Sequence, residues 1–210
     1  MKTAVAILNW NGFSLLNKFL PSVIKNTPNN VDIYIIDNGS TDNSVDFIKT
    51  DFPSVKIISL DDNYGFAKGY NLGIKKIDAD IICLLNNDVE VTSNWIDPII
   101  KLFKSEKNTA IIQPKLLDYN NRKMFDYAGA AGGFLDKFGY PYCRGRIYNN
   151  IEADDGQYDD ISKIFWACGA CFFIRKEIFE LVNGFDENYW AHMEEIDLCW
   201  RTQNLGYHVK

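Results

Sequence analysis

The sequence lacks an excess of basic residues. Its 210 residues include 22 Lys and Arg against 28 Asp and Glu, which gives a formal net charge of −6. This balance argues against nucleic acid or an anionic membrane as the main partner, because both select a basic surface. A nucleotide stays compatible with the composition, because a divalent cation and backbone N–H groups can neutralise its phosphates.

Long hydrophobic runs are also missing. No stretch approaches the roughly 18 apolar residues that a membrane span requires. The first apolar run, at 4–8, is too short for a signal peptide and leads directly into Asn9. We therefore expect a cytoplasmic protein, and one that rests on the inner face of a membrane is compatible with the sequence.

The cysteines form neither an even set nor a complete metal-binding pattern. Three of the five lie within apolar segments, which favours reduced thiols over a disulfide framework. Cys168 and Cys171 have C-x-x-C spacing, but no second Cys or His pair completes a zinc site. We predict that both are small packing residues of the core.

Internal repeats, low-complexity tracts and linkers are absent, so we expect one domain over 1–210. A dinucleotide fingerprint is absent too. Gly65, Gly69 and Gly73 are each separated by three residues, unlike G-x-G-x-x-G, and they follow the third expected strand. Gly65 and Gly69 still suit a close backbone approach to a ligand at a helix N-terminus.

Apolar runs alternate with helical patterns through the first half of the chain. Four runs predict buried strands, at 3–8, 33–36, 55–60 and 81–85. The segments between them have helical spacing, so the order is β-α-β-α-β-α-β. That order predicts a parallel sheet whose loops gather at the carboxyl ends of the strands.

Each of these four strands ends at a polar side chain: Asn9, Asp37, Asp61 and Asp88. Because the carboxyl ends of parallel strands share one edge, this pattern predicts a site for a polar ligand there. The alternative at 86–88 is an ordinary polar turn that closes a strand.

The second half is less regular. A helix at 95–103 and a strand at 110–116 precede a loop-rich excursion at 118–162, which we interpret as a functional cover. Its acidic residues are interpreted as a solvated surface: Asp154, Asp155, Asp159 and Asp160. Regular patterns return with a strand at 164–174 and helices at 176–182 and 193–204.

The last helix begins with Glu194, Glu195 and Asp197. These acids either stabilise the helix N-terminus, by about 0.3–1 kcal/mol each, or present a general base. Nearby Trp190 and Trp200 belong either to the core or to a platform for a sugar ring.

Several segments, in sequence order, resemble those of the family-2 glycosyltransferases: 9–11, 37–42, 63–73, 84–89, 169–175, 184–187 and 194–201. The resemblance is to the rhamnosyltransferase-like branch. It implies an inverting, nucleotide-sugar-dependent enzyme with a GT-A fold, an α/β sandwich around a mixed, mainly parallel sheet. It further implies a nucleotide-sugar-binding half at 1–117 and an acceptor-side half at 118–210, truncated at the C-terminus.

The resemblance assigns roles residue by residue. Asp88 would bind Mg²⁺ or Mn²⁺, Glu195 would be the catalytic base with Glu194 beside it, and Trp190 and Asp197 would lie on the acceptor side. The donor-binding residues would be Asn9, Asp37, Asn38, Gly65, Gly69, Asn71 and Asn87. The reaction implied is transfer of a hexose or deoxyhexose from a UDP- or dTDP-sugar to a hydroxyl of a glycan or lipid-linked glycan in bacterial polysaccharide assembly.

Two positions depart from the family pattern. Asn86 stands at the first position of the D-x-D metal motif, and Glu195 replaces the aspartate of the E-D motif. The first departure leaves a catalytically silent nucleotide-sugar-binding module as the alternative. A sugar-phosphate nucleotidyltransferase is disfavoured, because 9–12 contains neither Arg nor Lys. Arg144 and Arg146 are further candidates to pair with a phosphate. The sequence does not fix the sugar, the linkage or the oligomeric state.

Overall fold

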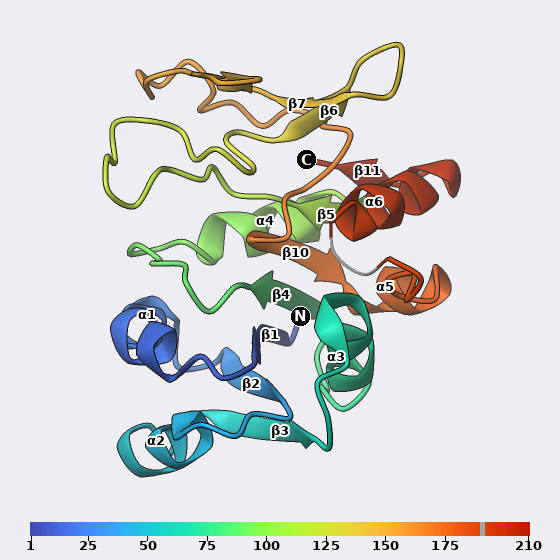
Figure 1. The fold of residues 1–210 in the computed structure, drawn as a ribbon. Helices are drawn as coiled ribbons and strands as arrows, with labels where there is room; N and C mark the ends of the chain where they lie inside the picture. The colour runs from blue at the N-terminus through green and yellow to red at the C-terminus, as the bar shows by residue number, and fades with distance from the viewer. Residues whose placement is uncertain (190–191) are drawn as a thin grey trace.

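The computed structural model describes residues 1–189 and 192–210, and this part of the chain is organised around a seven-stranded sheet (Figure 1). The strand order is β11-β5-β10-β4-β1-β2-β3. The strands are β1 (Thr3–Asn9), β2 (Asp32–Asn38), β3 (Lys56–Leu60), β4 (Ile81–Leu85), β5 (Thr109–Ile112), β10 (Cys171–Arg175) and β11 (His208–Val209). β1 to β4 are mutually parallel, and β10 runs antiparallel between β4 and β5. The predicted mixed, mainly parallel sheet is thus confirmed.

Helices cover both faces of this sheet. They are α1 (Phe13–Asn26), α2 (Ser44–Asp51), α3 (Gly65–Ile74), α4 (Asp97–Ser105), α5 (Lys176–Leu181) and α6 (Glu194–Asn204). Buried side chains of α1, α2 and α4 share one core cluster with Val5 and Ile7 of β1. Those of α3, α5 and α6 share a second cluster with Ala4 and Ala6. In Figure 1 α1 and α2 lie on the opposite side of the sheet from α3, α5 and α6.

The surroundings of β4 explain why its sequence is apolar at every position. Ile82 and Leu84 face one core cluster, while Ile81, Cys83 and Leu85 face the other, and all five are fully buried. A strand covered on both faces needs apolar residues at every position. Each such side chain contributes about 1.5–3 kcal/mol of transfer free energy. β4 therefore lies where the apolar run predicted it.

The cysteine prediction is also confirmed. All five cysteines are free and buried. Cys168 and Cys171 belong to the two core clusters, in which they pack as small apolar residues.

The excursion at 118–162 contains more regular structure than its sequence predicts. It includes an antiparallel sheet of β6 (Gly133–Leu135), β7 (Pro141–Cys143), β8 (Arg146–Ile147) and β9 (Asn150–Ile151). Figure 1 shows this small sheet at the end of the molecule beyond β5. Strands of two or three residues are too short to produce a readable alternation.

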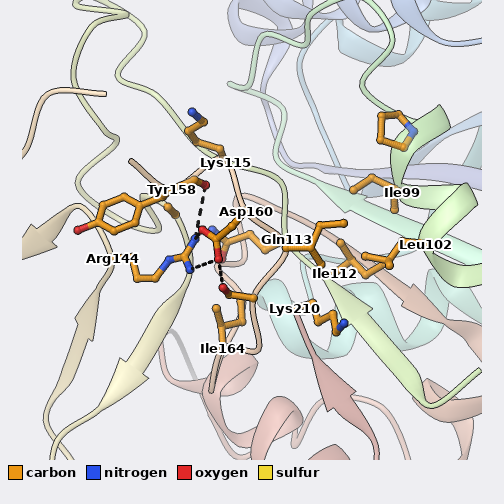
Figure 2. Close-up of a pocket in the computed structure, with 14 residues that line it drawn as sticks. Ile99, Leu102, Ile112, Gln113, Lys115, Arg144, Tyr158, Asp160, Ile164 and Lys210 are labelled. Atoms are coloured by element: carbon orange, nitrogen blue, oxygen red, sulfur yellow. Dashed lines mark hydrogen bonds and ion pairs between the residues drawn. The ribbon is translucent and has the colours of Figure 1, made fainter. Parts of the chain in front are cut away.

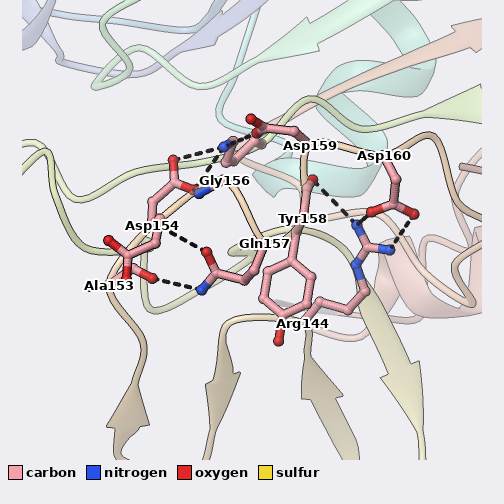
Figure 3. Close-up of polar contacts among 10 residues, drawn as sticks. Arg144, Ala153, Asp154, Gly156, Gln157, Tyr158, Asp159 and Asp160 are labelled. Atoms are coloured by element: carbon pink, nitrogen blue, oxygen red, sulfur yellow. Dashed lines mark hydrogen bonds and ion pairs between the residues drawn. The ribbon is translucent and has the colours of Figure 1, made fainter.

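The acidic cluster in this excursion is not simply a solvated surface. Asp154 lies 2.7 Å from Nζ of Lys115, which also pairs with Asp159. Asp160 pairs with Arg144 (Figure 3), and the charged atoms lie 3.0 Å apart. The two pairs of Lys115 join the excursion to the segment after β5. Asp155, Asp159 and Asp160 are exposed, as the solvated-surface interpretation predicts, and it is wrong only for Asp154, which is half-buried against Lys115.

In the part of the chain that the structure describes, no helix is both long enough and apolar enough to cross a membrane.

Candidate active site

Polar side chains meet where β1, β2 and β4 end. The sheet register pairs Asn9 with Asp37, and β4 lies on the other side of β1. Nδ2 of Asn87 donates to Oδ1 of Asn9 at 3.1 Å, and Nδ2 of Asn9 donates to Oγ of Ser44 at 3.1 Å. Asn9 and Asp37, two of the four predicted strand ends, therefore lie together at one edge, and Asn87, which the resemblance assigned to the donor, lies beside them. Their binding roles stay predictions.

The loops after β1 and β2 hold each other in place. Oδ1 of Asn11 accepts the Thr41 N–H at 2.7 Å, and Oγ of Ser40 accepts the Asn11 N–H at 3.0 Å. Asp42 accepts the Phe13 N–H at 3.0 Å. Burial alone would raise the pKa of Asp42, but hydrogen bonds from Ser44 and the Phe13 N–H hold it below its usual value. Asn11, Ser40 and Asp42 lie in the segments 9–11 and 37–42 that the resemblance named, but short polar loops do not reveal their hydrogen-bond partners in the sequence.

Asp37 is buried, yet its Oδ1 has no hydrogen-bond partner among residues 1–189 and 192–210. A buried carboxylate oxygen without a partner is costly in free energy. A ligand N–H or O–H group would remove that cost, so Asp37 is suited to bind a polar ligand at the sheet edge.

Asn38, Gly65 and Gly69 fix the start of α3 against β2. Nδ2 of Asn38 donates to Oδ1 of Asn63 at 2.9 Å and to the Gly65 carbonyl at 3.0 Å. Gly65 has a φ of +73°, which favours glycine. A Cβ at Gly69 would lie 3.0 Å from Leu8, so a side chain there would press on β1. These contacts shape the rim of the candidate site.

The side-chain amide of Asn71 forms its hydrogen bonds with other residues of the protein. Its Nδ2 donates to the Phe185 carbonyl at 2.9 Å and to Glu187 at 3.1 Å, and its Oδ1 accepts the Phe185 N–H at 2.9 Å. The side chain is buried. This use favours a structural role, in which Asn71 joins α3 to the turn at 183–187, over the predicted contact with the donor.

The segment after β4 leads into a large cleft. The Asn86 N–H donates to the Ala170 carbonyl at 2.9 Å, which places this segment beside the loop before β10. Asn86, Asp88 and Ala170 line a cleft of about 680 Å³, and Asp88 is exposed. Asp88 is thus available to a ligand, whereas the main chain of Asn86 is held by the protein.

Asp88 offers a single exposed carboxylate to a divalent cation. Among residues 1–189 and 192–210, no cluster of three or more His, Cys, Asp and Glu side chains could hold a metal ion. One exposed carboxylate fits an Mg²⁺ or Mn²⁺ ion that takes most of its ligands from a diphosphate and water. It does not fit an ion held by the protein alone.

Glu194 and Glu195 begin α6 in surroundings that disfavour charge. Oε2 of each is buried without a hydrogen-bond partner in the described part of the chain. Burial raises the pKa of Glu195, and the neighbouring Glu194 charge raises it further. Backbone N–H groups of Glu195 and Gly169 offset part of this rise in the pKa. A carboxylate with a raised pKa is a suitable proton acceptor near neutral pH.

Glu195 lies close to the loop that meets β4. A Cβ at Gly169 would be 3.8 Å from Oε1 of Glu195, and the next residue, Ala170, bonds to Asn86. The chain enters α6 through His192 and Met193 at φ values of +69° and +74°. Such left-handed residues cost about 1–3 kcal/mol each and cluster at functional sites. The fold therefore brings the last helix to the edge where β4 ends.

Of the residues predicted for the acceptor side or for a sugar platform, Asp197 is held by its own helix. Asp197 accepts from Nε of Arg201 at 2.8 Å, an i,i+4 pair on α6. Trp190 lies outside the described residues. Trp200 is half exposed, with its ring edge on Phe165 at 5.5 Å.

The two arginines predicted to pair with a phosphate are engaged by residues of the excursion at 118–162. Arg144 pairs with Asp160 beside a cavity of about 150 Å³ (Figure 2), and none of the predicted catalytic, donor-binding or metal residues in the described chain lines that cavity. Arg146 donates to the Tyr148 carbonyl at 3.2 Å and lies 4.6 Å from the Tyr127 ring centroid. These contacts favour structural roles.

Comparisons with known proteins agree with this geometry. The model of the family described as Glycosyl transferase family 2 matches residues 4–182. N-acetylglucosaminyl-diphospho-decaprenol L-rhamnosyltransferase of Mycobacterium tuberculosis is 24% identical over 208 residues, covering 91% of this chain and 67% of that protein. Rhamnosyltransferase WbbL of Escherichia coli K12 is 27% identical over 150 residues, covering 68% of this chain and 56% of that protein.

Solved structures share the fold. GalNAc-T7, crystallised with UDP, GalNAc and Mn²⁺, has a TM-score of 0.77 at 18% identity, over 100% of this chain and 42% of that one. The mannosyltransferase PcManGT of Pyrobaculum calidifontis, in complex with GDP-Man and Mn²⁺, has a TM-score of 0.67 at 12% identity. This match covers 99% of this chain and 53% of that one. The chain spans about half to two thirds of the length of the curated relatives it matches. It has the GT-A fold and belongs to glycosyl transferase family 2, with rhamnosyltransferases among its relatives, as the order of its motifs predicted.

Proposed function

We propose that this chain transfers a hexose or deoxyhexose, with inversion, from a UDP- or dTDP-sugar to a hydroxyl of a glycan or lipid-linked glycan in bacterial polysaccharide assembly. One observation carries the proposal. Glu195, a half-buried carboxylate with a raised pKa, lies beside Gly169, in the loop that bonds to the end of β4. A family-2 relative whose name specifies a decaprenol-linked substrate supports the lipid-linked acceptor.

The proposed step conserves atoms and charge. The acceptor O–H gives its proton to Glu195 while its oxygen bonds to the anomeric carbon of the donor. The bond between that carbon and the diphosphate oxygen breaks, and the nucleoside diphosphate leaves with the electron pair. Because attack comes from the face opposite the leaving group, the configuration inverts. Burial keeps the pKa of Glu195 raised, and the nearby Glu194 charge raises it further.

The donor would lie across the ends of β1, β2 and β4. Asp37 has a buried oxygen that no group in the described part of the chain binds and that suits an N–H group of the base, and Asn9 and Asn87 form the adjoining rim. Residues 1–117 would supply this half of the site and 118–210 the acceptor side. Asp88 would contribute one ligand to Mg²⁺ or Mn²⁺, which when bound neutralises charge on the leaving diphosphate.

The five buried, free cysteines support a reducing compartment, so we place the protein in the cytoplasm. A lipid-linked acceptor would bring it to the inner face of the membrane as a peripheral protein.

Asn86 motivates a second candidate, a nucleotide-sugar-binding module without catalytic activity. An amide at the first position of the metal motif removes one charge from the cation site. Such a module would bind the donor and release no nucleotide from it.

Thermal unfolding with a panel of nucleotide sugars, with and without Mn²⁺, tests the donor class. A ligand at 100 times its Kd stabilises the folded state by about 2.7 kcal/mol, which raises Tm by about 5 °C or more. We expect UDP- or dTDP-sugars to do so. Asp37→Asn should lose most of the shift, Asp88→Asn should lose the part that depends on Mn²⁺, and Asp46→Asn, exposed on α2, should lose neither. Equal shifts in Asp37→Asn and Asp46→Asn would contradict the donor site.

A further inference from the structure

We infer that the cleft between 86–95 and 114–128, here called the 114–128 cleft, binds a neutral, hydroxyl-rich sugar, the acceptor glycan. Its volume of about 680 Å³ lies within the usual range for small-molecule sites. The identification of this sugar as the acceptor rests on the proposed function. The charge and the shape that favour such a sugar are properties of the 114–128 cleft and do not depend on the proposed function.

The walls of the 114–128 cleft are held together by side chains. Arg122 pairs with Glu90 at 2.7 Å, which links the segment after β5 to the segment after β4. The Tyr119 ring packs edge-on against Phe19 of α1 at 5.2 Å, with Nζ of Lys18 4.2 Å from its centroid. A cleft that is shaped before binding loses less conformational entropy when a ligand enters.

The charges around this cleft disfavour an anionic ligand. Its two cationic side chains are engaged, Lys115 with Asp154 and Arg122 with Glu90. Asp88, Asp118 and Asp126 also line it, and none of them forms an ion pair within the described residues. Asp88 is assigned to the cation of the donor, so Asp118 and Asp126 set the charge of the rest of the cleft. These two carboxylates would repel a phosphate, whereas sugar hydroxyls can donate to them.

Asp118 and Asp126 each accept main-chain hydrogen bonds with one carboxylate oxygen only. Oδ1 of Asp118 accepts the Asn120 N–H at 2.8 Å, and Oδ2 of Asp126 accepts the Ala128 N–H at 2.8 Å. In the described part of the chain the second oxygen of each has no hydrogen-bond partner from the protein. The turns therefore fix both carboxylates and leave an oxygen of each for a ligand.

Aromatic rings complete the lining. Trp95 packs against Phe173 with ring centroids 5.5 Å apart, and Tyr119 is 41% exposed. Flat apolar surfaces beside a few hydrogen-bonding groups match a sugar, which has C–H faces and hydroxyl edges. The combination favours a carbohydrate over a purely apolar ligand.

The 114–128 cleft also joins the candidate active site. Asp88 and Ala170 belong to its lining, and Ala170 follows Gly169, which lies beside Glu195. A sugar at the inner end of the cleft would therefore have a hydroxyl near the proposed base. This places acceptor binding at 114–128, in contrast to the sequence prediction at Trp190 and Asp197.

Saturation-transfer NMR with neutral methyl glycosides of glucose, galactose and N-acetylglucosamine tests the inference, with glucose 1-phosphate as the anionic probe. We expect the neutral glycosides to bind, to keep binding at saturating UDP, and to bind about fivefold or more weakly in Asp126→Asn. Asp136→Asn is the matched control, because Asp136 caps a similar turn, accepting the Phe138 N–H at 2.8 Å, outside the cleft. If Asp126→Asn does not fold, Tyr119→Ala should give the same loss of binding.

Preferential binding of glucose 1-phosphate, unchanged binding in the cleft variants, or loss of the glycoside signal on addition of UDP would each overturn the inference. The last result would locate the signal at the donor site. Calorimetry with UDP and dTDP on the same samples separates the two proposals. A protein that binds a nucleotide but no glycoside refutes the acceptor cleft alone, whereas a protein that binds neither nucleotide also refutes the proposed donor.

Discussion

Burial and the neighbouring Glu194 charge both raise the pKa of Glu195. Its pKa rises because burial and then the Glu194 charge disfavour the ionised form. In activity terms, this makes Glu195 a stronger base than an exposed carboxylate. In stability terms, the ionised form at neutral pH costs the folded state free energy.

That cost predicts a pH-dependent effect of Glu195→Gln. A raised folded-state pKa means that the folded protein binds more protons, so the free energy of unfolding falls as pH rises from the unfolded-state pKa through the folded-state pKa. We expect Glu195→Gln to be more stable than the wild type at pH 7–8 and to lose this advantage near pH 4. Urea unfolding across this range provides the measurement. Glu177→Gln, exposed in α5, should differ from the wild type by less than about 0.5 kcal/mol. A Glu195→Gln protein less stable than the wild type at pH 8 would contradict the account.

At the scale of elements, the turn at 183–187 is held from two helices. Asn71 binds it from α3, and Arg201 of α6 donates to the Gly184 carbonyl at 2.9 Å. Because Arg201 also pairs with Asp197, the first two turns of α6 are fixed relative to α3. This arrangement holds the helix that carries Glu195.

Asn71→Ala tests the structural role against the donor-binding prediction. The substitution leaves the N–H and carbonyl of Phe185 without their partner, which we expect to cost about 2–3 kcal/mol of unfolding free energy. Asn188→Ala, which removes an exposed contact to Asp186, should cost less than about 0.5 kcal/mol. Denaturant unfolding and calorimetry with a nucleotide distinguish the roles. Lost nucleotide affinity at unchanged stability would favour donor contact instead.

The elements differ in how far the sequence determines them. β4 could be predicted from five consecutive apolar residues, because both of its faces are buried. β8, β9 and β11 could not, because each has two residues and depends on a partner strand. In the site, the polar ends of the strands predicted that Asn9 and Asp37 would share an edge with Asp61 and Asp88, whereas Asn87 came only from the family resemblance. The contact of Asn71 with Phe185 spans 114 residues of sequence, so no local pattern reveals it.

At the scale of the whole molecule, the turns of the small sheet carry exposed aromatic residues on a chain of net negative charge. Phe138 and Tyr140 lie in the turn between β6 and β7, and Tyr148 lies in the turn between β8 and β9. Their exposures are 73%, 64% and 74%. In an antiparallel meander these two turns lie at the same end of the sheet. Amphipathic aromatic side chains favour the interface between lipid and water, which supports the proposed peripheral membrane contact.

Vesicle sedimentation tests that contact. We expect the protein to co-sediment with vesicles of zwitterionic phosphatidylcholine, which do not repel its net negative charge, and the double variant Phe138→Ser, Tyr148→Ser to lose most of this binding. Leu181→Ser is the control, because Leu181 is 58% exposed at the end of α5, away from the small sheet. Equal sedimentation of the double variant and the wild type would show that these turns do not contact lipid.

The proposed function requires Glu195 to accept a proton during sugar transfer at the edge where β1, β2 and β4 end. The most direct test measures nucleoside diphosphate release from the stabilising nucleotide sugar, with Mn²⁺ and acceptor glycosides, alongside donor affinity by calorimetry. We predict that Glu195→Gln keeps donor affinity and loses about a hundredfold or more in rate, because a general base contributes about 10²–10⁴-fold. Glu177→Gln should keep both. Undiminished release in Glu195→Gln would contradict the assignment of the base, and a wild-type protein that binds the donor without releasing nucleotide would establish the silent binding module instead.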